Sequence, residues 1–193
     1  MDLHLPFDAR PDRISRRRIS QLMATAAASP LLLAFYPDHE STHRVSEGPA
    51  YKPGSPFRTE IIDPGTPGSR FLLSGRVFST TDKPISQALV DLWNVQNNGK
   101  YDFDGFNLRG RQLTAKDGRF EFLTIEAIPY GSRTAHFHFK LSAPGFEPLT
   151  TELYLPGLAQ NSRDSSFRTS NLLQKVDETG IRKGRYEFYL RPA

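Results

Sequence analysis

Six short runs along the chain alternate apolar and polar residues, and this period of two constrains the fold more than any other feature. The runs are FLLSGRVFS, ALVDLWNV, RFEFLTI, AHFHFKLS, TTELYLP and RYEFYLR, at residues 71–79, 88–95, 119–125, 135–142, 150–156 and 185–191. Turn sequences such as TTDKP, KDG and APG separate them. Short strands at this spacing, with no long helical period between them, are typical of an all-β sandwich. We therefore expect that fold class.

The strand-like runs begin near Phe71, and this start divides the chain. Residues 36–70 are rich in Pro, Gly and Ser, which predicts a loop-rich extension, whereas residues 71–193 are predicted to form the folded domain. Helix candidates are limited to the N-terminal segment and the run NLLQKV at residues 171–176.

The first 35 residues have the order of charge and hydropathy that an export signal needs. Arg16, Arg17 and Arg18 precede a modestly apolar run of small residues, and Ser15 precedes the arginines. This order is typical of a twin-arginine signal, a route that carries folded proteins. A disordered basic tail or a short amphipathic helix is the alternative for residues 1–35. With the signal, we expect a protein exported to the periplasm or the exterior.

The composition makes several classes of function poor candidates. The formal net charge is +4, of which the five arginines and three aspartates of residues 1–18 supply +2, and no basic stripe interleaved with aromatics follows. We therefore expect no nucleic-acid partner. No run of about 20 apolar residues exists, so no membrane span is expected. The chain has no cysteine, which rules out disulfides and thiolate metal sites.

The run AHFHFK at residues 135–140 places two histidines on one face of a predicted strand. His136 and His138 project one way, whereas Phe137 and Phe139 project toward the core. Two imidazoles at this spacing can bind one metal ion, although a solvated polar face gives the same pattern.

Two tyrosines stand where they could complete such a site. Tyr130 precedes His136 by six residues, and Gly131 and Ser132 predict a turn that could bring its phenol back over the histidines. Tyr101 lies in the Gly- and Asp-rich sequence NNGKYDFDG, which predicts a loop that leaves it free of the core. A core aromatic residue is the alternative for each.

These motifs, in their order, resemble the intradiol ring-cleavage dioxygenases, which include catechol and protocatechuate dioxygenases. The resemblance runs through EGPAYKPGSPFRTEI, DLWNVQNNGKYD, LRGRQLTAKDGRFEFLTI, YGSRTAHFHFKLSAPG and LTTELYLPG, between residues 47 and 157. It implies an immunoglobulin- or prealbumin-like β-sandwich of the short, exported, single-domain type. It also implies an Fe(III) ion held by Tyr101, Tyr130, His136 and His138.

The resemblance further implies a reaction. A catechol would bind to the iron, with Tyr130 as the displaced tyrosinate. Dioxygen would then open the ring between the two hydroxyl-bearing carbons, and the product would be a muconate-type diacid. Arg133 aligns with the family's arginine beside the substrate, so it is expected to stabilise charge that develops on the ring.

Glu152 departs from the family pattern, because catechol and protocatechuate dioxygenases commonly carry a glutamine there. A carboxylate beside an electron-rich catecholate is repulsive unless it is protonated or paired, for which Arg133 is a candidate. Glu152 with His136 and His138 could also form a two-histidine, one-carboxylate Fe(II) site. A non-catalytic prealbumin-like binding module is the rival from another class.

The remaining expectations are structural. Trp93 and Phe137 are predicted to be core residues, because each lies in an alternating strand. Asn107 and Arg109 are predicted to be surface loop residues, with a place in the pocket lining as the alternative. The loop PGLAQNSRDSSFRTS and the Pro-rich segment 47–58 could form contacts in a homo-oligomer or the rim of a pocket.

Overall fold

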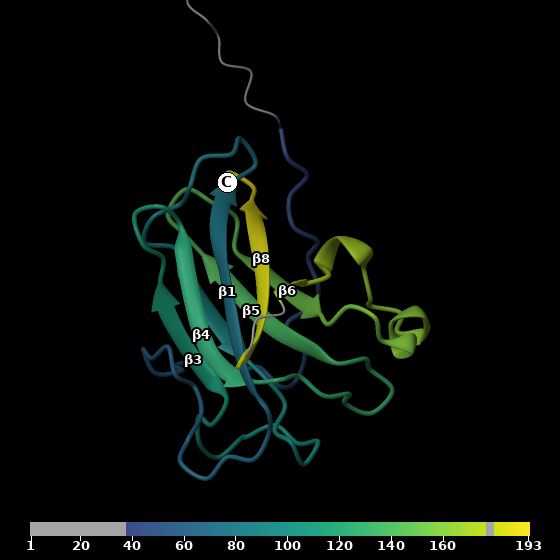
Figure 1. Cartoon of the computed structure of the whole chain (residues 1–193). Helices are drawn as coiled ribbons and strands as arrows, with labels where there is room; N and C mark the ends of the chain where they lie inside the picture. Colours follow the sequence, from purple (N-terminus) through teal and green to yellow (C-terminus); the bar gives the residue numbers. More distant parts are fainter. Residues whose placement is uncertain (1–37, 177–179) are drawn as a thin grey trace, which may run out of the picture. The chain divides into compact units, whose positions relative to one another are not determined.

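The computed structural model describes residues 38–176 and 180–193, which form two four-stranded β-sheets (Figure 1). The first sheet has the order β4-β1-β8-β7 and the second sheet the order β3-β2-β5-β6. The strands are β1 Arg70–Ser79, β2 Leu89–Trp93, β3 Arg109–Leu113, β4 Arg119–Ile125, β5 His136–Ser142, β6 Leu149–Tyr154, β7 Gln174–Val176 and β8 Arg182–Leu190. Two short 3-10 helices, η1 Ala159–Arg163 and η2 Thr169–Asn171, lie between β6 and β7. The all-β prediction is confirmed, while residues 1–35, with the predicted export signal, lie outside the described residues.

All six predicted strands form, as β1, β2, β4, β5, β6 and β8, and their ends differ from the prediction by at most three residues. Strand β3 was missed because its sequence RGRQL shows no alternation of apolar residues. The helix predicted for residues 171–176 is wrong. The segment Gln174–Val176 is β7, which pairs antiparallel with β8, so pairing with a neighbouring strand decides its conformation. Within the described residues, no helix is long and apolar enough to cross a membrane.

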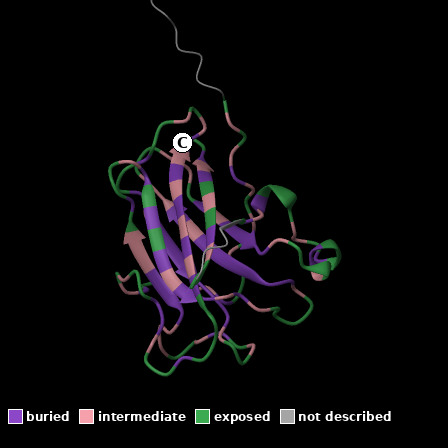
Figure 2. Ribbon diagram, viewed as in Figure 1, coloured by how far each residue is buried: buried purple, intermediate pink, exposed green. Residues whose placement is uncertain are grey.

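The main core lies between the two sheets and is made by the inward residues of both (Figure 2). On β1, buried residues alternate with half-buried ones after the exposed Arg70. Aromatic rings from the two sheets meet in this core: the centroids of Phe71 and Phe137 are 5.4 Å apart, and those of Phe139 and Phe188 are 5.0 Å apart. Full burial of one such ring stabilises the fold by about 1.5–3 kcal/mol. The prediction that Phe137 is a core residue is confirmed.

The centre of the first sheet requires a glycine. Strand β1 pairs antiparallel with β4 on one side and parallel with β8 on the other. A Cβ atom at Gly75 would lie 2.0 Å from the carbonyl oxygen of Tyr186 and 2.7 Å from the ring of Phe120. Only glycine allows the neighbouring backbone to approach this closely.

The loop-rich segment 38–69 packs against both sheets. Its backbone is bonded to the second sheet through Val45 N–H to the Thr150 carbonyl at 2.8 Å, and to the first through Ile61 N–H to the Leu123 carbonyl at 3.0 Å. Ile61 is fully buried in the main core. The extension therefore contributes apolar residues and backbone hydrogen bonds to the fold, although it contains no helix or multi-residue strand.

A smaller buried cluster lies on the outward face of the second sheet. It contains Ala50, Trp93, Val95 and Tyr101, with Tyr51 packed against it. Trp93 is buried as predicted, but it lies in this cluster and not between the sheets. The outward residues of β2, β5 and β6 are therefore enclosed by the extension and by loops, which creates a buried space for polar side chains.

Candidate metal centre

Strand β5 places His136 and His138 side by side on the outward face of the second sheet. Because the strand alternates, Phe137 and Phe139 point into the core, and the two imidazoles share the other face. Their Nε2 atoms are 3.1 Å apart, and both residues are buried, with exposed fractions of 2% and 6%. The strand thus places both imidazoles on one face, as its alternation predicted, and the structure shows that their nitrogen donors meet at a buried point.

Neighbouring groups fix the orientation of both imidazoles. His136 Nδ1 donates to the carbonyl oxygen of Thr134 at 2.6 Å, which leaves its Nε2 as an acceptor that faces His138. The His138 ring stacks on Trp93, with centroids 4.9 Å apart and an interplanar angle of 3°. Burial lowers the pKa of both histidines, for His138 well below its ordinary value. Both imidazoles are therefore held in the neutral form that binds metals.

Tyr101 reaches the same point from the loop that follows β2. Its hydroxyl lies 2.9 Å from His138 Nε2. The ring is 7% exposed and belongs to the smaller buried cluster, so the prediction that the loop leaves it free of the core is wrong. Burial, and next the negative charge of Glu152, raise the pKa of this phenol. Without a bound metal ion the hydroxyl keeps its proton, although Arg133 and Arg109 partly offset this rise in pKa.

The part of the loop that follows Tyr101 is held in place by two sets of hydrogen bonds. The Asp102 carboxylate accepts from backbone N–H groups of the same loop, those of Asp104, Gly105 and Asn107. The Lys52 ammonium donates to three carbonyl oxygens of the loop at 2.8–3.0 Å, those of Phe103, Asp104 and Gly105. Hydrogen bonds within the loop and from Lys52 can therefore hold Tyr101 in one position.

Arg109 is a buried support of this loop, which corrects the prediction that it is a surface residue. It is 1% exposed at the start of β3, and it donates to the carbonyl oxygens of Asp102 and Ala50, each at 2.9 Å. Its guanidinium lies 6.0 Å from the Tyr101 ring centroid. Asn107 is half-buried, and its side-chain oxygen accepts from Asp63 N–H at 3.0 Å. Both residues fasten the loop to the extension, a role that only the paired strand β3 reveals.

Tyr130 lies beside Tyr101 at the exposed edge of the site. Its backbone forms a bridge with Arg133 across the turn predicted at Gly131, which has a φ of 57°. Its ring meets that of Tyr101 edge-on, with centroids 5.1 Å apart. The side chain is 43% exposed, and its hydroxyl has no hydrogen-bond partner among the described residues. The structure thus brings Tyr130 next to the site, with its phenol exposed.

Arg133, Glu152 and Asp164 form a charged group behind the histidines, in which both carboxylates are buried and Arg133 is half-buried. Arg133 Nε donates to both oxygens of Asp164 at 3.0 and 2.9 Å, and its terminal nitrogens donate to the two oxygens of Glu152. Tyr154 donates from its hydroxyl to Glu152 Oε2 at 2.6 Å. The Glu152 carboxylate is thus paired with Arg133, and Asp164 and Tyr154 are members of this network that sequence reasoning missed.

The positions of the donor atoms favour one of the two metal sites that the sequence left open. One nitrogen from each histidine and one Glu152 oxygen lie within 4.8 Å of one another. However, Glu152 Oε1 is 3.5 Å from His138 Nδ1, the nitrogen on the other side of the ring from Tyr101 and His136. Both Glu152 oxygens also accept hydrogen bonds from Arg133. Two histidines with tyrosine therefore fit one ion better than two histidines with Glu152.

Comparisons with known proteins place the chain in a family. The family model described as Dioxygenase matches residues 46–179. Catechol 1,2-dioxygenase 2 of Acinetobacter lwoffii is 32% identical over 169 residues, which cover 74% of this chain and 62% of that protein. Chlorocatechol 1,2-dioxygenase of Rhodococcus opacus is 33% identical over 173 residues, which cover 72% of this chain and 66% of that one. The chain thus spans about two thirds or less of the length of these relatives.

Solved structures agree with this placement. The dioxygenase domain of a dioxygenase–carbohydrate-binding protein fusion from Streptomyces sp. SirexAA-E has a TM-score of 0.76 and 40% identity, and the match covers 80% of this chain and 100% of that one. Hydroxyquinol 1,2-dioxygenase from Pseudomonas putida DLL-E4 shares the fold with a TM-score of 0.73 at 24% identity, over 80% of this chain and 68% of that one. The matched family model, the relatives and the shared β-sandwich show that this chain belongs to the intradiol ring-cleavage dioxygenase family.

Proposed function

We propose that this chain is an Fe(III)-dependent intradiol dioxygenase that opens a catechol-type ring between its two hydroxyl-bearing carbons. The observation that carries the proposal is the convergence of three donor atoms. His138 Nε2 lies 2.9 Å from Tyr101 Oη and 3.1 Å from His136 Nε2. Dioxygen is the second substrate, and a muconate-type diacid with both oxygen atoms incorporated is the product.

Four side chains would hold the iron: Tyr101, Tyr130, His136 and His138. The donor set fits a hard trivalent ion, since two phenolates offset most of its charge and neutral imidazoles complete the site. When bound, Fe(III) would withdraw electron density from a coordinated catecholate and so make the ring carbons reactive toward dioxygen. Zinc fits less well, because its usual protein ligands are Cys, His and carboxylates.

The protein groups supply positioning and proton transfer. Tyr130 is exposed and its hydroxyl is unpaired, so as a phenolate its Oη can accept a proton from the incoming catechol. The guanidinium of Arg133 is fixed by two carboxylates three residues before His136, where a stationary positive charge can stabilise negative charge on the ring. Trp93 and the loop supports of Tyr101 keep the remaining groups in place.

Metal analysis, an absorption spectrum and oxygen uptake over a catechol panel test the proposal. The iron-loaded protein should absorb visible light through its tyrosinates, and it should consume one dioxygen per catechol. Tyr101→Phe should abolish the visible band and the uptake. A colourless protein that binds no iron would support the binding module instead. A pale Fe(II) protein that tolerates Tyr101→Phe and is inactivated by Glu152→Ala would support the two-histidine, one-carboxylate site.

Export by a twin-arginine signal in residues 1–35 is a further part of the proposal, supported by the arginine cluster and the apolar run that follows it. Fractionation of cells that express the natural gene tests it. Native protein found in the cytoplasm with residues 1–35 intact would overturn it.

A further inference from the structure

The two histidines of the site differ in what their Nδ1 atoms meet. His136 Nδ1 donates to the carbonyl oxygen of Thr134 at 2.6 Å, so the backbone already fixes this ring. His138 Nδ1 is buried and has no hydrogen-bond partner among the described residues. One oxygen of Glu152, Oε1, lies 3.5 Å from it, slightly beyond the ordinary length of a hydrogen bond. A buried ring nitrogen without a partner is costly, so its surroundings indicate what it is for.

Strand pairing places Glu152 beside this nitrogen. His138 on β5 is the direct partner of Glu152 on β6, so both side chains project from the same face of the second sheet. The two side chains are 8% and 5% exposed, which shields the contact from water. On the opposite edge of the His138 ring, Nε2 faces Tyr101 and His136. Glu152 therefore lies behind the ring, away from the ion that Nε2 would bind.

The Glu152 carboxylate still has room for a donor, although it is paired with Arg133. Its Oε2 accepts from Arg133 and from the Tyr154 hydroxyl, the latter at 2.6 Å. Among the described residues, Oε1 accepts only from Arg133, at 3.3 Å. An ionised carboxylate accepts about four hydrogen bonds, so Oε1 can also accept from His138. A glutamine would turn its NH2 group toward one nitrogen of Arg133 in either orientation, which is why a carboxylate suits this position.

We infer that Glu152 is a positioning residue for His138: its carboxylate accepts the Nδ1–H and thereby holds Nε2 toward the iron. The inference rests on the proposed function and concerns the same site. A histidine that binds a metal commonly gives its other ring N–H to a carboxylate, which fixes the ring and makes the binding nitrogen more basic. A negative charge behind the ring also favours Fe(III) over Fe(II), because the attraction grows with the charge of the ion.

Iron affinity and the reduction potential of the full chain test this role. Glu152→Gln keeps the size of the side chain and removes its charge. It should weaken Fe(III) binding, measured by competition with nitrilotriacetate, by about 10–100-fold, the usual cost of losing such a partner. It should weaken Fe(II) binding less. The Fe(III)/Fe(II) midpoint potential should therefore rise by about 59 mV for each tenfold change in the ratio of the two affinities. Wild-type affinity and potential in this variant would overturn the inference.

The wild-type protein provides a test that needs no variant. Loaded with Ga(III), a trivalent ion without redox chemistry, it can be studied by NMR of the histidine ring nitrogens. His138 Nδ1 should carry a proton that exchanges slowly with water, because the carboxylate holds it. A proton that exchanges as fast as that of a solvated imidazole would overturn the inference, even if Glu152→Gln does not fold.

A control variant separates this role from packing. Tyr154→Phe removes one donor to Glu152 but leaves the carboxylate and its charge, so it should change the iron affinity and the potential much less than Glu152→Gln does. Equal changes in the two variants would assign the effect to packing and overturn the inference. The failure of the proposed function would look different, because the wild-type protein itself would then lack Fe(III) binding or the visible tyrosinate band.

Discussion

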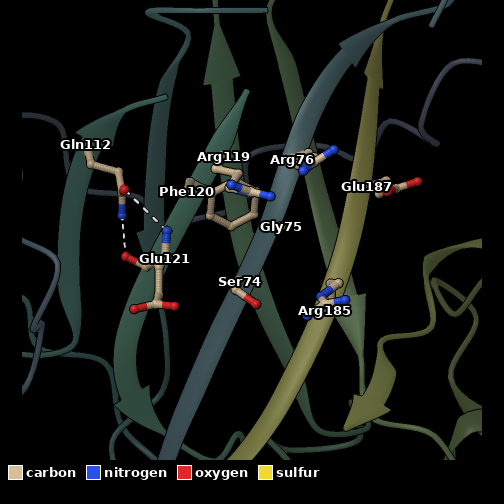
Figure 3. Close-up of a pocket in the computed structure, with 9 residues that line it drawn as sticks. All are labelled: Ser74, Gly75, Arg76, Gln112, Arg119, Phe120, Glu121, Arg185 and Glu187. Atoms are coloured by element: carbon tan, nitrogen blue, oxygen red, sulfur yellow. Dashed lines mark hydrogen bonds between the residues drawn. The ribbon is translucent and has the colours of Figure 1, made fainter. Parts of the chain in front are cut away.

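The two sheets of this protein are built by the same alternation, yet their outward faces differ completely. On the first sheet the outward face carries charged residues in contact with solvent, and Figure 3 shows several of them around a shallow hollow: Arg76, Arg119, Glu121, Arg185 and Glu187. On the second sheet the outward face carries His136, His138 and Glu152, and all three are buried. The difference comes from what covers each face, because the extension and the loops enclose the histidines of the second sheet, whereas the charged residues of the first sheet around this hollow stay in contact with solvent.

This comparison shows why polar strand residues have two different meanings. An exposed ion pair such as Arg119 with Asp117 is surrounded by water and contributes little to stability. A buried polar residue must be bonded, charge-compensated or ready to bind a ligand, since burial without a partner is costly. The second sheet meets this requirement with the Arg133 network and the convergent donors of Tyr101 and the histidines. The site can therefore be recognised by burial, where the residue pattern alone is ambiguous.

Removal of one imidazole is the strongest test of the difference between the two outward faces. His138→Ala should abolish iron binding and catechol-dependent oxygen uptake, with a loss larger than the roughly 10–100-fold that removal of a metal ligand's supporting partner costs. Arg185→Ala, on the outward face of the first sheet, should leave both unchanged. Iron content and oxygen uptake measure the difference. Full iron occupancy in His138→Ala would contradict the assignment of the site.

Arginines beside the two outward faces should also differ in how much they contribute to the free energy of unfolding. Arg133→Ala should destabilise the iron-free protein by about 3 kcal/mol, because it leaves two carboxylates in place without their partner. Arg119→Ala should cost less than about 1 kcal/mol, because its ion pair with Asp117 is exposed. Urea unfolding of both variants provides the free energies. Equal losses would show that the Arg133 network is as solvated as the surface pair.

Arg109 provides a smaller test of the cover over the second sheet. Arg109→Leu should lower the free energy of unfolding by about 2 kcal/mol, because the carbonyl oxygens of Asp102 and Ala50 lose their donor while buried. It should also weaken iron binding, because the Tyr101 loop loses a support. Arg76→Leu on β1 is the matched control, with little expected change in either quantity. Wild-type iron affinity in Arg109→Leu would mean that the loop is held without this residue.

Acidic pH is expected to give the smallest of these effects on the free energy of unfolding. Burial alone would raise the pKa of Asp164, but N–H donors from Thr134 and Ser166 and the guanidinium of Arg133 outweigh it and hold the pKa below its ordinary value. The stability that follows is fully present above the unfolded pKa of about 3.9 and is lost as the pH falls through the lower folded value. Between about pH 5 and about pH 2, the free energy of unfolding of the iron-free protein should therefore depend less on pH in Asp164→Asn than in the wild type.

The sequence alone determined the fold class, six of the eight strands and the face shared by His136 and His138. These features are local, since alternation along one strand decides which side chains share a face. The motif order from DLWNVQNNGKY to YGSRTAHFH also led to the family that the comparisons then established. The ferric site of Tyr101, Tyr130, His136 and His138 and the export signal remain predictions.

Only the tertiary structure decided which polar residues are buried and what they contact. Strand β3 exists because β2 pairs with it, and that pairing places Arg109 beneath the Tyr101 loop. The register of β5 with β6 sets Glu152 opposite His138, and a loop 31 residues after Arg133 supplies Asp164. Such contacts join segments far apart along the chain, and their energies depend on the water excluded when these segments meet. A pattern read along one strand contains no information about that exclusion, so the environment of each charge emerges only when the sheets and loops are assembled.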